Sequence, residues 1–222
     1  MLSGDRVLLN VGNYKFNVRH LLIIAVLAIA FSTAFIMRSF PIKYGYYLNE
    51  FDPYFDYRAT KYIVDNGLEA YLKWHDNMSW YPDGRDIPKT SQVGLHVTAA
   101  YLYKIFGGNS SILDFTIIFP VVIGSLTTIV VFALVRSLGG TTAGLFSALL
   151  IAFTPAIIQR GNLGWFKSEP LGLFLGLLAV YLLISAMKHK PRMAIVKAIA
   201  GGLLLGLANA SWGGIQYFSI PI

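Results

Sequence analysis

Five stretches of the chain are apolar over lengths that match the thickness of a lipid bilayer. They cover residues 20–37, 114–135, 141–158, 170–187 and 194–210. A helix needs about 20 mostly apolar residues to cross the hydrocarbon core. Only 13% of the residues are charged, whereas soluble domains contain about 25%. The sequence therefore predicts an all-α, polytopic membrane protein with about five to six transmembrane helices.

The basic residues indicate how these helices are oriented. Lys and Arg are concentrated before the first stretch, at Arg136, and between Lys188 and Arg192. All three groups lie on the cytoplasmic side, as the positive-inside rule requires, only if residues 91–106 do not cross. We therefore expect residues 91–106 to form an interfacial helix within a first external loop, 38–113. The second external loop, 159–169, then shares its outer face.

Several kinds of chemistry are excluded by the composition. The chain has no cysteine, which rules out disulfides, thiolate nucleophiles and Cys-ligated zinc. Its four histidines are scattered, and it has no phosphate-binding glycine loop, HExxH or G-x-S-x-G motif. The net charge of +7 follows from the basic groups between apolar stretches, so we expect no nucleic-acid partner.

Three carboxylates and an arginine lie among aromatic residues soon after the first span, in the stretch from Glu50 to Arg58. Pro53 favours extended backbone at Asp52, so we expect Asp52 to cap a helix in which Asp56 lies one turn further on. A carboxylate at the membrane surface could ligate a hard divalent cation. An N-cap with an Asp56–Arg58 surface pair is equally consistent with this pattern.

A second charged segment contains Arg160, Lys167 and Glu169. Pro170 is expected at the first position of the next helix, whose positive end favours an anion, either Glu169 itself or a bound phosphate. Lys167 or Arg160 could contact such a phosphate. The pattern alone favours the alternative, which is an ordinary charged loop between two helices.

A third segment, Trp80 to Asp86, is a turn with aromatic residues on one side and charges on the other. Trp80 and Tyr81 could contact lipid headgroups while Arg85 reaches a phosphate. Interfacial anchoring alone is the simpler interpretation of this composition.

Four motifs, in this order and spacing, resemble one family. They are Asp52-Pro53-Tyr54-Phe55-Asp56-Tyr57-Arg58, then Trp80-Tyr81-Pro82-Asp83-Gly84-Arg85, then Arg160 with Gly164 and a charged triplet beginning seven residues after the arginine, and Ser211-Trp212-Gly213-Gly214. The chain resembles the catalytic subunit of oligosaccharyltransferase, a GT-C type membrane glycosyltransferase, and is most similar to its archaeal branch.

The resemblance implies transfer of an oligosaccharide from a dolichyl phosphate or diphosphate carrier to the asparagine of Asn-x-Ser/Thr acceptor polypeptides, with Mn²⁺ or Mg²⁺ as cofactor. It implies that Asp52 and Glu169 are catalytic and metal-binding. The candidate substrate-binding residues are Arg58, Arg85, Arg160 and Lys167. The membrane would be the archaeal cell membrane, or the endoplasmic reticulum membrane in a eukaryote.

The chain departs from the family pattern in two respects. Lys167 stands where the family usually has a metal-binding aspartate, and a protonated ammonium cannot ligate a metal. Residues 1–222 would correspond to the amino-terminal part of the transmembrane domain, without the further spans and the soluble acceptor-reading domain. Two alternatives therefore stay open: a non-catalytic membrane scaffold paralogue, or another polyprenyl-phosphate-dependent membrane glycosyltransferase.

Overall fold

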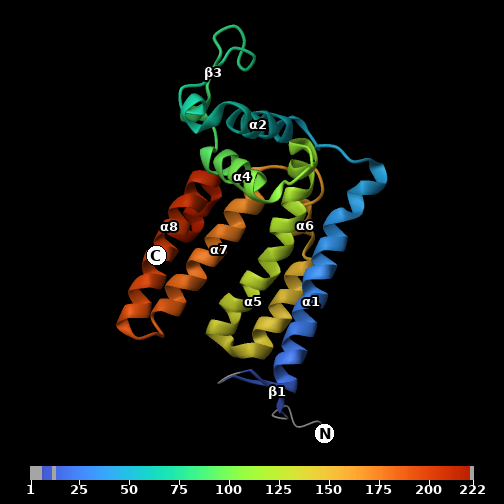
Figure 1. The fold of residues 1–222 in the computed structure, drawn as a ribbon, viewed down its shortest axis with the longest axis vertical. Coiled ribbons are helices and arrows are strands. Elements are labelled where there is room, and N and C mark those ends of the chain that lie inside the picture. The colour runs from blue at the N-terminus through green and yellow to red at the C-terminus, as the bar shows by residue number, and fades with distance from the viewer. Residues whose placement is uncertain (1–6, 12–13, 221–222) are drawn as a thin grey trace.

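The computed structural model describes residues 7–11 and 14–220, which form a bundle of apolar helices with more polar helices across one end (Figure 1). Within these residues, four helices are long and apolar enough to cross a membrane. They are α1 (Val18–Ser39), α5 (Ile112–Phe153), α7 (Ser168–Ala186) and α8 (Pro191–Ser211). A short antiparallel hairpin, β1 (Val7–Val11) and β2 (Tyr14–Asn17), precedes α1.

Gly140 divides α5 into two antiparallel arms. A straight helix of 42 residues would be about 63 Å long, twice the roughly 30 Å hydrocarbon core. The backbone of Gly140 is not helical, with φ 86° and ψ 177°. A Cβ on Gly144 would lie only 2.8 Å from the carbonyl oxygen of Phe132, although twelve residues of straight helix extend about 18 Å. The chain therefore reverses at Gly140, and the arms correspond to the predicted spans 114–135 and 141–158.

A layer of shorter segments covers the end of the bundle between α1 and α5 (Figure 1). It consists of η1 (Phe40–Tyr44), α2 (Phe51–Tyr71), the paired strands β3 (His75–Asp76) and β4 (Arg85–Asp86), α3 (Ile87–Thr90) and α4 (Val93–Phe106). With 14 residues, α4 would be about 21 Å long and too short to cross a bilayer. The structure thus agrees with the expectation that residues 91–106 do not span. Within α2, the non-helical backbone of Gly67 (φ 86°, ψ 166°) divides the span into two shorter helical pieces.

The remaining elements are short. α6 (Pro155–Gln159) continues the second arm of α5 after a break at Thr154. After α8, the chain forms η2 (Gly213–Ile215) and α9 (Gln216–Ser219). The long helix α8 therefore ends directly before the Trp212-Gly213-Gly214 motif.

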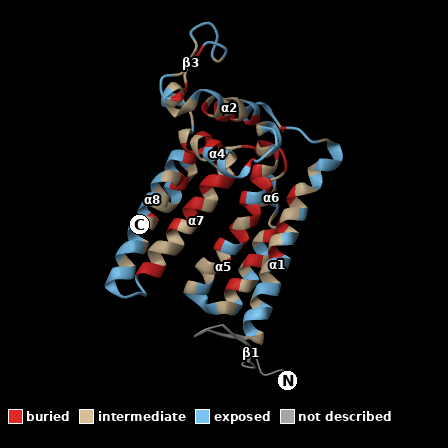
Figure 2. Ribbon diagram, viewed as in Figure 1, coloured by how far each residue is buried: buried red, intermediate tan, exposed pale blue. Residues whose placement is uncertain are grey.

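The largest cluster of buried residues lies where α5 meets α7, α8 and α4, and smaller clusters lie between α2 and α4 and between α1 and α5 (Figure 2). The outward faces of the bundle are apolar as well, since Ile29 on α1 is 58% exposed and Leu203 on α8 is 72% exposed. Extended apolar surface is rare on soluble monomers and is expected where a helix faces lipid. These outward faces are therefore suited to contact with the lipid hydrocarbon rather than with water.

A buried polar network fastens α2 to α4. His96 Nε2 lies 2.8 Å from Asp56 Oδ1, and His96 Nδ1 lies 2.7 Å from the Tyr71 hydroxyl. All three side chains are buried, and buried polar groups are stable only when they are hydrogen-bonded. The alternative Asp56–Arg58 surface pair does not form, because Arg58 pairs with Asp76 instead. The network fixes the helix that carries Asp52.

Candidate functional site

Two loops that are far apart in the sequence meet at Gly164. The Asn49 backbone N–H donates to the Gly164 carbonyl oxygen at 3.0 Å, and Asn49 Nδ2 donates to the Leu163 carbonyl oxygen at 2.7 Å. Gly164 has φ +80°, and a Cβ there would lie 2.2 Å from the Tyr47 carbonyl oxygen. Glycine is therefore required both by the left-handed backbone and by the close approach of the loops.

This contact brings together five charged residues, which we call the charge cluster: Glu50, Asp52, Arg160, Lys167 and Glu169. Lys167 Nζ donates to Asp52 Oδ2 at 2.7 Å and lies 3.8 Å from Glu50 Oε2. Arg160 Nη1 donates to Glu169 Oε1 at 3.4 Å. The expectation that the two loops share one face is consistent with these contacts, which join Asp52 to a residue 115 positions away.

The start of α2 differs from the expected cap. The helix begins at Phe51, so Glu50 occupies the N-cap position and Asp52 lies in the first turn. Glu50 has φ 66° and ψ 177°, a backbone conformation that costs a residue other than glycine about 1–3 kcal/mol. The prediction that Asp52 caps the helix is therefore wrong, because the chain turns sharply one residue before the helix. An acidic residue in the first turn still benefits from the helix dipole.

Lys167 is held tightly within the cluster. Burial alone would lower its pKa, but the hydrogen bond to Asp52 and the negative charges of Glu169, Asp52 and Glu50 outweigh burial, and the pKa is raised. The Trp165 ring lies 4.9 Å from Lys167 Nζ and 5.3 Å from Arg160 Cζ, close enough for cation–π attraction to both. The ammonium therefore stays protonated at neutral pH and has a fixed position.

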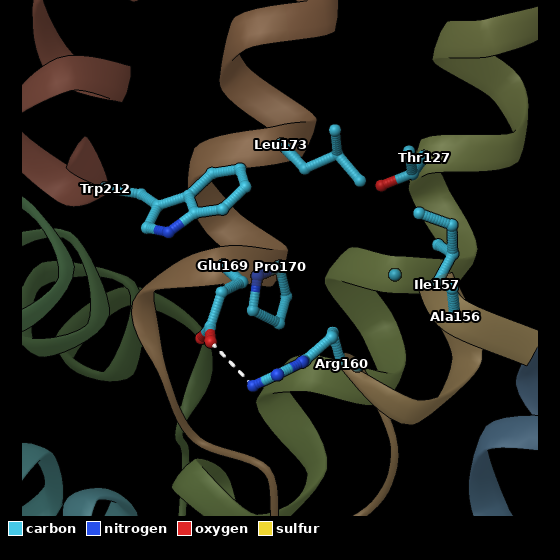
Figure 3. A pocket seen from close by; sticks show the side chains of 10 residues that line it. Thr127, Ala156, Ile157, Arg160, Glu169, Pro170, Leu173 and Trp212 are labelled. Carbon is cyan, nitrogen blue, oxygen red and sulfur yellow. Dashed lines mark hydrogen bonds and ion pairs between the residues drawn. The ribbon is translucent and has the colours of Figure 1, made fainter. Parts of the chain in front are cut away.

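The Arg160–Glu169 pair closes one side of a pocket of about 320 Å³ (Figure 3). Its other lining residues are mostly apolar and come from α5, α6, the loop after α6, α7 and the turn after α8: Gly124, Thr127, Ala156, Ile157, Gly161, Pro170, Leu173 and Trp212. Glu169 Oε2 is buried and has no hydrogen-bond partner among the described residues. The pocket thus combines an apolar wall with the charged pair of Arg160 and Glu169, a combination typical of small-molecule sites.

Arg38 lies behind the wall of this pocket. It is fully buried, and its Nε is the closest atom to the Cβ that Gly124 or Gly161 would carry, at 2.5 and 3.5 Å. Of its guanidinium nitrogens, Nη1 donates to the Ala34 carbonyl oxygen. The two glycines leave the space that this side chain fills. A positive charge behind the wall favours a negatively charged group at the polar side of the pocket.

Arg58 and Arg85 are engaged elsewhere. Arg58 pairs with the buried Asp76, and its Cζ lies 5.5 Å from the Trp74 ring. Arg85 donates to Thr90 and lies over the Phe55 ring, 4.5 Å from its centre. Both arginines therefore hold the β3–β4 segment against α2, and their substrate-binding roles stay predictions.

Three residues of the site were given no role by the sequence. Glu50 is next to the predicted motif, but its approach to Lys167 depends on its unusual backbone. Trp165 lies between the two cations, and its position two residues before Lys167 was the available signal. Trp212, within the Trp-Gly-Gly turn, lines the pocket from the far end of the chain.

The family model described as "Oligosaccharyl transferase STT3, N-terminal" matches residues 21–222. The chain is 34% identical over 201 residues to the Arabidopsis thaliana protein named dolichyl-diphosphooligosaccharide–protein glycosyltransferase subunit STT3B. That similarity covers 89% of this chain and 27% of the plant protein, so the chain spans about a quarter of this relative.

Solved structures of the Archaeoglobus fulgidus oligosaccharyltransferase are similar in fold. One, a complex with an inhibitory peptide and a dolichol-phosphate, has a TM-score of 0.75 at 20% identity and covers 91% of this chain and 25% of the other. Another, a complex with Zn and sulfate, has a TM-score of 0.74 at 21% identity and covers 88% and 26%. The arrangement of helices is therefore shared with a multi-pass membrane glycosyltransferase.

Proposed function

The chain belongs to the oligosaccharyl transferase STT3 family, and we propose that its charge cluster takes part in transferring an oligosaccharide from a dolichyl phosphate or diphosphate carrier to the asparagine of an Asn-x-Ser/Thr acceptor. The observation that supports this most is that the charges of Asp52 and Glu169, from separate segments of the chain, both act on Lys167, while Glu169 also lines a largely apolar pocket. A carrier lipid and an acceptor peptide both need access to such a position.

The pocket suits the lipid-linked donor. Its apolar wall faces the helix bundle, where a polyprenyl chain is soluble, and Arg160 is 58% exposed at its polar side. A guanidinium there can pair with a phosphate oxygen and stabilise the negative charge that develops as the carrier leaves. Arg160 is thus proposed to bind the carrier phosphate.

Asp52 suits the acceptor. Its side chain is 61% exposed, and Oδ2 accepts from Lys167. A carboxylate with remaining acceptor capacity can accept a hydrogen bond from the asparagine amide and orient its nitrogen toward the sugar. In the transfer, the amide nitrogen bonds to the anomeric carbon, the bond from that carbon to the carrier phosphate oxygen breaks with its electron pair on that oxygen, and the proton lost by the amide passes to the released phosphate.

The divalent cation implied by the family resemblance does not fit the described residues as they are arranged. Among residues 7–11 and 14–220, no group of three or more His, Asp or Glu side chains converges as a metal site. One oxygen of Asp52 is already bonded to the Lys167 ammonium, which carries no lone pair for a metal. Mn²⁺ or Mg²⁺ stays a prediction for this chain.

Transfer assays test the proposal. The native protein is reconstituted with a lipid-linked oligosaccharide and a peptide that contains Asn-x-Thr, and glycopeptide is measured with and without Asp52→Ala. We expect the initial rate to fall at least about 100-fold, because orientation of the nucleophile is lost. Asp65→Ala is the matched control, since Asp65 is exposed on the same helix and pairs only with Lys61 among its described contacts. An unchanged rate for Asp52→Ala would refute the site.

The Lys167–Asp52 ion pair favours a second candidate, a non-catalytic scaffold of the same family, because it engages a carboxylate that catalysis would use. The same assay separates the two. A scaffold gives no glycopeptide in the unsubstituted protein, whatever the donor or cation supplied.

A further inference from the structure

We propose that the Lys167 ammonium is a built-in cation of the charge cluster and that it keeps divalent metal ions away from Asp52. The proposal concerns the same site as the proposed function and rests on the position of that site. In this chain, the lysine of the cluster itself offsets part of the negative charge of the carboxylates.

Three carboxylates act on the one ammonium. Lys167 Nζ is 2.7 Å from Asp52 Oδ2 and 3.8 Å from Glu50 Oε2, and the charge of Glu169 also acts on it. The side chain is only 17% exposed and lies against the Trp165 ring. A lysine on an open surface would sample many rotamers, whereas these contacts hold the ammonium between the carboxylates.

A metal ion would need the same space. Mg²⁺ and similar hard cations bind carboxylate oxygens at about 2.0–2.6 Å and collect at least six ligands. An ammonium already 2.7 Å from Asp52 Oδ2 blocks that approach and repels a second cation at short range. Metal binding at Asp52 would therefore require the ammonium to move away first.

The charges of the cluster support the same conclusion. Glu50, Asp52 and Glu169 contribute three negative charges, and Arg160 and Lys167 contribute two positive charges, which leaves a net charge of −1. An aspartate at position 167 would make the net charge −3, and one divalent ion would restore −1. The ammonium thus produces the electrostatic balance that a carboxylate and a bound metal would produce together.

Mn²⁺ binding to the protein in detergent tests the proposal, with free Mn²⁺ measured by electron paramagnetic resonance. We expect weak binding to the unsubstituted protein and at least tenfold tighter binding to Lys167→Ala, because the repelling charge is removed. Lys167→Asp should bind tighter still. The double variant Asp52→Ala/Lys167→Ala should lose the gain. Lys61→Ala is the control, since it removes an ammonium from a Lys–Asp pair elsewhere on α2.

Equal affinity of the unsubstituted protein and Lys167→Ala would overturn the proposal, as would a gain that persists without Asp52. If Lys167→Ala does not fold, Lys167→Met keeps the length of the side chain without its charge and is tested in its place. Lys167→Arg keeps a positive charge and should bind Mn²⁺ as weakly as the unsubstituted protein. The Mn²⁺ binding assay does not depend on oligosaccharide transfer. A failure of transfer would therefore refute the proposed function alone, and a failure of Lys167→Ala to bind Mn²⁺ more tightly would refute this inference alone.

Discussion

Asp52 and Asp56 lie one turn apart on the same helix and have opposite surroundings. The Asp52 side chain is 61% exposed and is paired with Lys167, from a loop 115 residues away. The Asp56 side chain is 9% exposed and is paired with His96, 40 residues away on the adjacent helix of the same layer. One carboxylate can meet a substrate, whereas the other is enclosed by its own fold.

The difference shows how a single helix can hold a reactive group in place. A buried carboxylate is stable only if its partners satisfy it, so the Asp56 network makes the docking of α2 on α4 specific. An exposed ion pair contributes little to stability and can exchange its partner for a ligand. Asp56 is thus expected to position α2, while Asp52 is expected to contact the acceptor substrate.

Replacing Asp56 by alanine should have the largest effect on stability. His96 would be left fully buried with one ring nitrogen unpaired, and a small cavity would remain. We expect the free energy of unfolding in detergent to fall by about 3 kcal/mol, the upper range for an unsatisfied buried polar group. Denaturant unfolding followed by circular dichroism measures this loss. Asp65→Ala, on the exposed face, should change it by less than about 0.5 kcal/mol, and equal losses would contradict the distinction.

Gly164→Ala should separate the two loops without touching the Asp56 network. The new Cβ would overlap the Tyr47 carbonyl oxygen, 2.2 Å away, and φ +80° is unfavourable for alanine. We expect the free energy of unfolding to fall by about 2 kcal/mol. The transfer rate should fall by more than the fraction of folded protein does. Gly202→Ala is the control, since a Cβ on Gly202 meets nothing within 4 Å. A normal rate for Gly164→Ala would show that the loop contact does not position Asp52.

The membrane helices and the shared face of the loops could be predicted from sequence because both depend on local composition. Each apolar run has to be long enough to cross the bilayer, and basic residues mark the cytoplasmic ends. The ends of α8, Pro191 and Ser211, accordingly lie close to the predicted bounds 194 and 210. The reversal at Gly140 also falls between two predicted spans.

The partners of the charged residues could not be predicted in the same way. Asp56 has Arg58 close by in the sequence, yet it pairs with His96, because docking of α2 on α4 brings that ring to it and places Arg58 next to Asp76. The pairing of Asp52 with Lys167 depends on the close approach of two backbones at Gly164. Such contacts follow from tertiary packing, which no local pattern specifies.

Acid should weaken the β3–β4 segment by protonating Asp76. Burial alone would raise the pKa of Asp76, but hydrogen bonds from Ser79, the Met78 backbone and Arg58 outweigh it and hold the pKa below its ordinary value of 3.8. The ionised Asp76 therefore stabilises the folded protein fully well above pH 3.8. This stabilisation, about 1 kcal/mol, is lost as the pH falls through the lowered pKa of Asp76. Fluorescence of Trp74 and Trp80 between pH 6 and 2 follows the change. The transition should be absent in Asp76→Asn, and its persistence there would assign it to another group.

Asp52→Asn should have the smallest effect on stability and a large effect on transfer. The amide is nearly isosteric with the carboxylate, and the lost ion pair is largely exposed, so the free energy of unfolding should change by less than about 0.5 kcal/mol. The same substitution removes the negative charge proposed to orient the acceptor amide, so the transfer rate should fall at least about tenfold. Unfolding and transfer measured on one preparation separate the two effects. A stability loss comparable to that of Asp56→Ala would mean that Asp52 is a structural residue like its neighbour, because a carboxylate free to act on a substrate cannot also be essential to the packing of the helix that carries it.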